Sequence, residues 1–72
     1  MSDTILQELH DSEINASVAT FYNGIFFCRI GDSANGYQAE ANLGSWAESV
    51  RWLEETAIRL YPDSEFARMR IG

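Results

Sequence analysis

Apolar and polar positions along the middle of the chain predict three strands. Residues 13–22 alternate between apolar and polar side chains, which is the period-two pattern of a strand with one buried side. Residues 25–30 are rich in β-branched and aromatic side chains, and residues 37–43 alternate again. Asn23-Gly24 is a strong hairpin signal between the first two strands, and residues 31–36 predict a loop.

The segments before and after these strands have apolar residues at the spacing of helices. Residues 4–10 predict a short helix in which Thr4 and Gln7 form a capping box. The segment from Gly44 to Pro62 predicts a long helix, since Ser45 and Glu48 form a capping box and Pro62 ends the helix. Residues 63–72 then form a short helix or a tail. The stripe that we expect to face the sheet is Trp46, Val50, Leu53, Ala57 and Leu60.

The order of these elements predicts the fold class. We expect a single domain over residues 1–72 of the α+β class, with a three-stranded antiparallel sheet. A short N-terminal helix and a long C-terminal helix pack on this sheet. A chain of 72 residues buries only about 60% of the surface that its unfolded form exposes, so a partner subunit would add useful burial.

The turn at Asn23-Gly24 allows two registers for the first hairpin. A two-residue turn would split the apolar residues of both strands between the two faces. A three-residue turn with a left-handed Gly24 pairs Phe21 with Ile25 and Val18 with Cys28, and we prefer it. One face of the hairpin then carries Ile14, Ala16, Val18, Phe26, Cys28 and Ile30.

The opposite face of the hairpin is also unusually apolar. Two interpretations stay open: the N-terminal helix or the C-terminal tail, with Phe66 and Met69, covers it, or it is an exposed patch for a partner or a second copy. Its residues are Ala19, Phe21, Ile25, Phe27 and Arg29.

Trp52 lies away from the sheet-facing stripe of the long helix, on a flank with Glu48, Glu55 and Arg59. A tryptophan among carboxylates is a candidate anchor for a partner, because large aromatic side chains carry much of the energy of protein interfaces. The alternative is that the tail folds back and Phe66 packs on Trp52. The spacing of residues does not separate these two interpretations.

The charge of the chain indicates which classes of partner it can bind. The net charge is −6, there is no lysine, and residues 1–28 hold Asp3, Glu8, Asp11 and Glu13 with no arginine. Nucleic-acid binding needs a basic face, so we expect none, and we expect attraction to basic protein surfaces instead. The N-terminus lacks the pattern of a signal peptide or a membrane span, and the one cysteine allows no internal disulfide. We therefore expect a cytoplasmic location and no membrane binding.

Motifs for catalysis are weak throughout. Cys28 points inward and the one histidine, His10, lies in the first helix, so no nucleophile and base are paired. Gly31 to Gly36 has the spacing of a phosphate loop without its lysine. Carboxylates such as Asp32 and Glu40 are expected on a solvated acidic rim. We expect no enzyme activity, no metal and no cofactor.

The element order resembles that of the double-stranded-RNA-binding domain over the whole chain. That resemblance implies RNA binding, but the last helix begins Ser45-Trp46-Ala47-Glu48 where the RNA-binding family has a lysine-rich segment. The segments INASVATFYNG and NGYQAEANLGSWAESVRWL also look like small uncharacterised bacterial proteins, a resemblance that implies no known activity.

These observations favour a non-enzymatic, acidic protein-binding module. The most specific hypothesis is a phage or mobile-element inhibitor of the anti-CRISPR type, in which carboxylates occupy a basic nucleic-acid-binding surface. Two alternatives are a bacterial housekeeping or regulatory protein that acts by homodimerisation and protein binding, and an RNA-binding domain, which the charge disfavours. The candidate partner-binding residues are Trp52, Glu48, Glu55, Phe21, Ile25, Phe27, Asp32 and Glu40.

Overall fold

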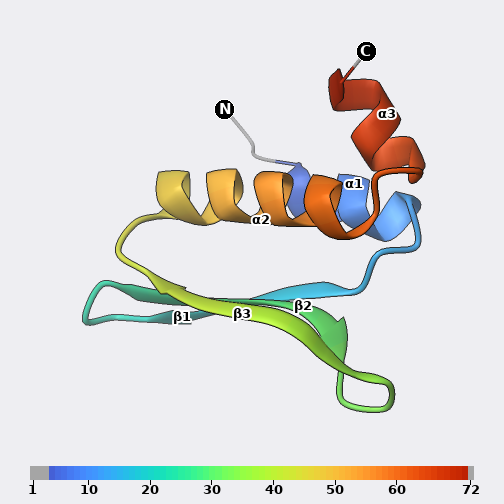
Figure 1. Cartoon of the computed structure of the whole chain (residues 1–72). Coiled ribbons are helices and arrows are strands. Elements are labelled where there is room, and N and C mark those ends of the chain that lie inside the picture. Colours follow the sequence, from blue (N-terminus) through green and yellow to red (C-terminus); the bar gives the residue numbers. More distant parts are fainter. Residues whose placement is uncertain (1–3, 72) are drawn as a thin grey trace.

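The chain folds into a three-stranded antiparallel sheet with helices before and after it (Figure 1). This computed structural model describes residues 4–71, so Asp3 of the acidic N-terminal third and Gly72 of the tail lie outside the described residues. The elements are α1 (Ile5–Asp11), β1 (Ala16–Phe21), β2 (Ile25–Asp32), β3 (Gly36–Leu43), α2 (Trp46–Leu60) and α3 (Glu65–Ile71).

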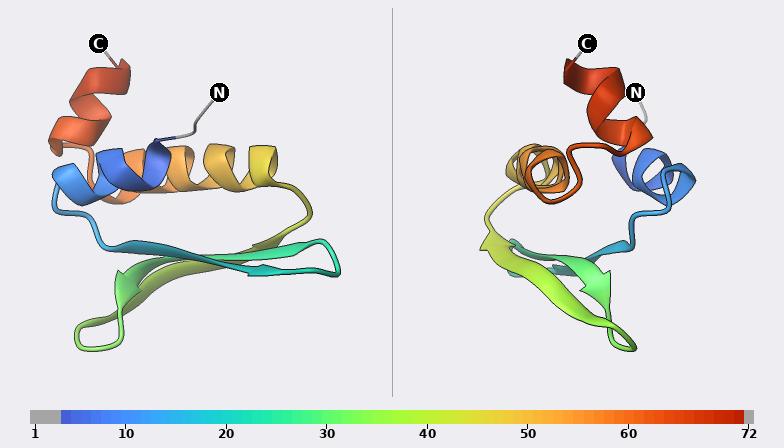
Figure 2. Two further views of the ribbon diagram at one scale, coloured as in Figure 1. Left: turned by 180° about the vertical axis from the view of Figure 1, so that it is seen from behind. Right: turned by 45° about the vertical axis from the view of Figure 1, so that its right-hand side comes forward.

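The helices lie on one side of the sheet. Figure 2 shows α1 and α2 side by side over one face, with α3 above them on the side away from the strands. α1 contacts β1, whereas α2 contacts β2 and β3, so both helices are needed to cover the width of the sheet. The α+β architecture predicted from the sequence is confirmed, and the segment after Pro62 continues into the short helix α3.

The three-residue turn sets the register of the first hairpin as predicted. Phe21 pairs with Ile25 and Val18 with Cys28. Gly24 has a φ of 92°, and its N–H donates to the carbonyl of Phe21 over 3.0 Å. The helix-facing side of the sheet therefore carries the apolar set that the pattern predicts, and the central strand β2 contributes the fully buried Cys28 and Ile30.

The strands begin and end at different residues from those predicted. β1 starts at Ala16 because the chain turns sharply just before it: Glu13 has a φ of 62°, and the N–H of Ile14 donates to the carbonyl of Leu9. β2 runs on to Asp32, beyond a bulge at Ile30 and Gly31, so the expected loop over residues 31–36 shrinks to residues 33–35.

Helix α2 starts where the capping pattern predicts. The Ser45 hydroxyl accepts a hydrogen bond from the Glu48 N–H at 3.2 Å and stands 3.1 Å from the Glu48 carboxylate. The predicted capping box at Thr4 and Gln7 is wrong, since the Thr4 side chain makes no cap hydrogen bond. Its hydroxyl donates to the Glu8 carboxylate instead, because that carboxylate lies within 2.8 Å, one helical turn away.

The core fills the space between the sheet and the helices. The predicted stripe of α2 faces this core: Leu53 and Ala57 are fully buried, while Trp46, Val50 and Leu60 pack around them. Phe26 of β2 lies against Trp46, with ring centroids 6.1 Å apart. The buried hydrophobic residues are Ile5, Leu9, Ile14, Cys28, Ile30, Leu53, Ala57, Phe66 and Ala67.

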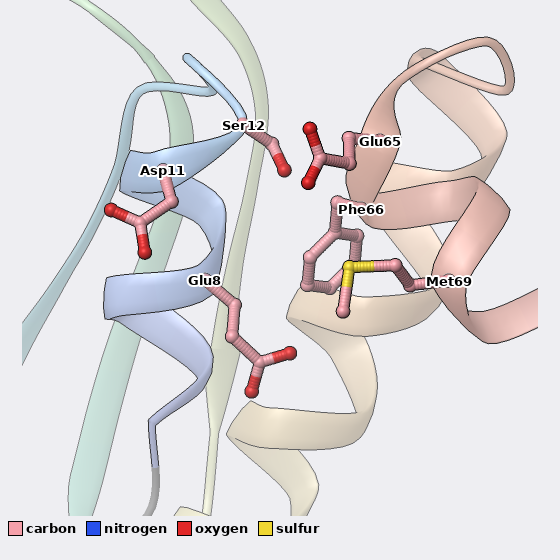
Figure 3. Close-up of a pocket in the computed structure, with 6 residues that line it drawn as sticks. All are labelled: Glu8, Asp11, Ser12, Glu65, Phe66 and Met69. Carbon is pink, nitrogen blue, oxygen red and sulfur yellow. The ribbon is translucent and has the colours of Figure 1, made fainter.

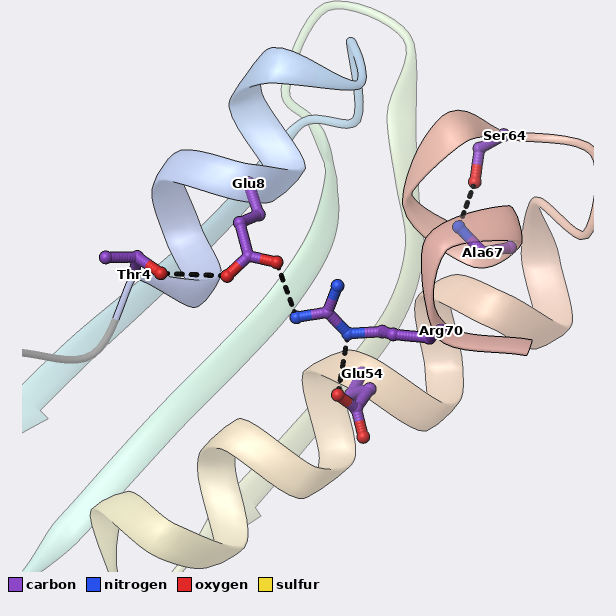
Figure 4. A network of polar contacts seen from close by, with 6 residues as sticks. All are labelled: Thr4, Glu8, Glu54, Ser64, Ala67 and Arg70. Atoms are coloured by element: carbon purple, nitrogen blue, oxygen red, sulfur yellow. Dashed lines mark hydrogen bonds and ion pairs between the residues drawn. The ribbon is translucent and has the colours of Figure 1, made fainter. Parts of the chain in front are cut away.

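Arg70 of α3 joins all three helices (Figure 4). Its guanidinium contacts the carboxylate of Glu8 on α1 at 2.7 Å and that of Glu54 on α2 at 2.6 Å. The same group lies 3.9 Å from the ring centre of the buried Phe66. This network positions α3 against the other two helices, on the side that faces away from the sheet.

Candidate protein-binding surfaces

Within residues 4–71, no helix or strand covers the face of the sheet opposite the helices, which is called the open face below. The interpretation that α1 or the C-terminal tail covers this face is wrong, because both lie on the α2 side (Figure 2). Phe66 is buried in the core there, and Met69 is 68% exposed on α3. α2 packs on β2 and β3 and α1 packs on β1, so the two helices cover the same face of the sheet side by side.

Large apolar side chains are exposed on this open face. Phe21 of β1, Ile25 of β2 and Tyr37 of β3 are 52%, 40% and 41% exposed, and the half-buried Phe27 lies on the same face. Phe21 and Ile25 are cross-strand partners at the hairpin end. The predicted residues Phe21, Ile25 and Phe27 thus share this face, and Tyr37 lies on it opposite Gly31, toward the other end of β2.

Arg29 occupies the open face between two aromatic rings. Its guanidinium carbon lies 4.8 Å from the ring centre of Phe27 and 4.5 Å from that of Tyr37, within the range of cation–π attraction. A guanidinium nitrogen also lies 3.9 Å from the carboxylate of Glu40 on β3. Stacking and the ion pair both restrict the Arg29 side chain, so this part of the face is ordered before any partner binds.

A second surface lies at the edge of α2 beside the end of β3. Trp52 is half-buried there and packs against the core, and it lines a shallow groove of about 210 Å³. The other residues that line this groove are Leu43, Glu48, Arg51 and Glu55. The structure thus brings together Trp52, Glu48 and Glu55, and Trp52 is both a packing residue and part of the surface.

These two surfaces are separate. The groove at Trp52 belongs to the helix side of the sheet, whereas Phe21, Ile25, Phe27 and Glu40 belong to the open face. The set of residues predicted from the sequence therefore divides between two sites.

Asp32 belongs to neither surface. Its carboxylate accepts hydrogen bonds from the Asn35 N–H at 2.6 Å and from the Asn15 side chain at 2.6 Å, at the turn between β2 and β3. The Asn35 N–H, followed by side-chain donors, lowers the pKa of Asp32. These contacts give the carboxylate a local structural function, since they tie the turn to the start of β1.

A small pocket between α1 and α3 has no counterpart in the sequence analysis (Figure 3). It has a volume of about 160 Å³, and Phe66 and Met69 form its apolar part. Glu8, Asp11, Ser12 and Glu65 line the rest of it, and Figure 3 shows the Asp11 carboxylate pointing away from Phe66 and Met69.

The side chains that suggested catalysis lie in unsuitable environments. Burial raises the pKa of the Cys28 thiol, and a hydrogen bond with the Ser49 hydroxyl opposes this effect. The neutral thiol is a poor nucleophile. His10 is exposed in the last turn of α1. Within residues 4–71, no group of three His, Cys, Asp or Glu side chains is placed to hold a metal ion, and no helix is long and apolar enough to cross a membrane.

Comparison with protein-family models, with curated proteins and with solved structures finds no significant match for this chain. The resemblance to the double-stranded-RNA-binding domain is therefore one of element order.

Proposed function

We propose that this chain is a non-enzymatic protein-binding module whose main contact surface is the open face of its sheet. The observation that carries the proposal is the exposure of Phe21, Ile25 and Tyr37 together on a face that no element within residues 4–71 covers. Monomeric proteins rarely leave large contiguous apolar patches exposed, and such patches commonly mark interaction sites.

The composition of this face suits protein recognition. Aromatic residues and arginine are enriched at protein interfaces and supply most of their binding energy. Here Phe27, Arg29 and Tyr37 are already stacked on a rigid sheet, so little side-chain entropy is lost when a partner binds. A reducing cytoplasm suits such a module, because its one cysteine, Cys28, forms no disulfide.

The absence of enzyme activity in this proposal rests on the environment of the candidate groups. Cys28 is buried under α2 as a neutral thiol, and His10 is exposed on a different element. Catalysis by a thiol requires a base within hydrogen-bond reach and an accessible sulfur.

Site-specific photo-crosslinking tests this surface. A photoreactive phenylalanine analogue placed at position 21 of the full chain should form protein adducts in a bacterial lysate. The same analogue at position 69 is the matched control, because Met69 is 68% exposed on α3, away from the open face. No adducts from position 21, or equal yields from the two positions, would contradict the proposed surface.

A second candidate function is the binding of a basic protein surface at the groove around Trp52. The observation that favours it is the pair of exposed carboxylates, Glu48 and Glu55, that flank this tryptophan on a chain of net charge −6. An inhibitor that occupies a basic nucleic-acid-binding channel, as in the anti-CRISPR class, is its most specific form. Such binding should weaken strongly with salt, and an affinity for a nucleic-acid-binding protein that salt leaves unchanged would rule it out.

A further inference from the structure

We infer that the occupant of the open face is a second copy of this chain, an inference that rests on the proposed binding role of that face. Two copies packed sheet against sheet would form four layers, with helices outside and two sheets inside. Antiparallel sheets pack in this way in β-sandwiches, about 10 Å apart. Phe21, Ile25 and Tyr37 would then be removed from water in both copies.

Charge favours this face as the place where two copies meet. Each copy carries a net charge of −6, so most orientations bring carboxylates of the two chains together. On the open face, the strands contribute one cation and one anion, Arg29 and Glu40, which already form an ion pair. The face is therefore close to neutral, and two copies can approach there with little repulsion between the contact surfaces.

The size of the face indicates a weak dimer. Three strands about 4.8 Å apart and six to eight residues long present a surface of roughly 15 by 25 Å. The area of such a face is smaller than the roughly 800 Å² that each partner of a stable complex buries. We therefore expect a dissociation constant between about 10 and 500 µM, which reversible complexes with small interfaces reach.

Dimerisation would also present the groove at Trp52 twice. The groove lies on the helix side of the sheet, so face-to-face packing leaves it accessible on both copies. A partner with two basic segments could then bind both grooves at once, with a gain in avidity and no new contacts.

Sedimentation equilibrium of the purified full chain tests the inference. We expect the 8.1-kDa chain to dimerise reversibly, and we expect Phe21→Glu and Ile25→Glu each to raise the dissociation constant at least about tenfold, because they place a charge in the apolar contact. Met69→Glu is the control with the same change in charge, and it should alter the constant by less than about twofold. Circular dichroism of each variant verifies that the fold is retained.

The change of the dissociation constant with salt concentration is an independent test. Dimerisation of two acidic chains through an apolar face should strengthen from about 20 to about 300 mM NaCl, because salt screens their repulsion. A chain that stays monomeric up to about 1 mM, or a dimer that Phe21→Glu leaves intact, overturns the inference.

If the chain is monomeric while position 21 still crosslinks to another protein, the inference of a second copy is wrong and the proposed function stands. If position 21 yields no adducts at all, the proposed function fails as well.

Discussion

Gly31 lies at the bulge in β2, opposite Tyr37 near the start of β3, and the backbone leaves no room there for a side chain. Its φ is +115°, and an added Cβ would lie 2.6 Å from the Gly36 carbonyl oxygen and 2.9 Å from the Gln38 nitrogen. Both contacts are with backbone atoms, which cannot rotate away. The N–H of Gly31 also donates to the carbonyl of Asn15 over 2.7 Å, so the bulge fixes the entry into β1 as well.

Gly31→Ala should therefore destabilise the protein more than a change at another left-handed glycine. We expect a loss of about 3 kcal/mol or more in the free energy of unfolding, measured by urea denaturation. Gly24→Ala is the control, because Gly24 has a φ of +92° with no atom within 4 Å of the added Cβ, and it should cost about 1 kcal/mol. Equal losses for the two variants would show that the crowding at Gly31 is relieved by backbone movement.

At the scale of elements, the two helices that bracket the sheet start in different ways. α2 begins with a cap in which Ser45 accepts from the Glu48 N–H, whereas α1 begins at Thr4 without such a bond. Both segments have a side chain of the capping type at the right spacing. The difference arises because the Thr4 hydroxyl is satisfied by Glu8.

Ser45→Ala should accordingly cost about 1 kcal/mol in the free energy of unfolding, the usual value of a lost helix cap. Thr4→Ala should cost less, about 0.5 kcal/mol, because an exposed hydroxyl-to-carboxylate contact contributes little to stability. Thermal or urea unfolding of both variants measures this. The assignment of the cap is wrong if Thr4→Ala is the more damaging change.

The attachment of α3 through Arg70 predicts a dependence on pH. The Thr4 hydroxyl and then Arg70 lower the pKa of Glu8 from its ordinary value of 4.5. Ionised Glu8 therefore stabilises the fold above about pH 4.5, and this contribution disappears as the pH falls through the lowered pKa.

Arg70→Met should remove about 1–2 kcal/mol of stability at pH 7, since it removes two ion pairs and the contact with the Phe66 ring. It should also reduce the loss of stability below pH 4.5, because part of the shift of Glu8 depends on Arg70. Urea denaturation at pH 7 and pH 3 tests both statements. Arg68→Met, which removes an exposed arginine of the same helix, should change neither value appreciably.

At the scale of the whole molecule, Cys28 reports on the core. It lies on the central strand, fully buried beneath α2, and burial raises the pKa of its thiol. Both effects suppress its reaction with thiol reagents until the sheet and α2 separate.

A disulfide exchange reagent should therefore modify the native chain at least about 100-fold more slowly than the chain in concentrated urea. The comparison uses the same protein in both conditions, so it needs no variant. Equal rates would mean that α2 opens readily and that the core around Cys28 is less protected than its burial indicates.

The candidate surfaces could be predicted only in part. Alternation in β1 and β2 indicated that Phe21, Ile25 and Phe27 share a face, and the structure places them together. The sequence did not indicate the sandwiching of Arg29, because Tyr37 reaches this face through the irregular register next to Gly31.

The sequence by itself determined the order of α1, the three strands and α2, the start of α2 and the register of the first hairpin, whereas it left the segment of α3 open between a helix and a tail. Each of these depends on residues close together in the chain, where periodicity, capping and turn geometry act directly. Only the tertiary structure decided that α1 and α3 lie on the same side as α2, so that no helix in the described part of the chain covers the other face of the sheet. A sheet has two faces on which a helix can pack. Which face each helix takes depends on contacts between segments far apart in the chain, such as the ion pair of Arg70 with Glu8.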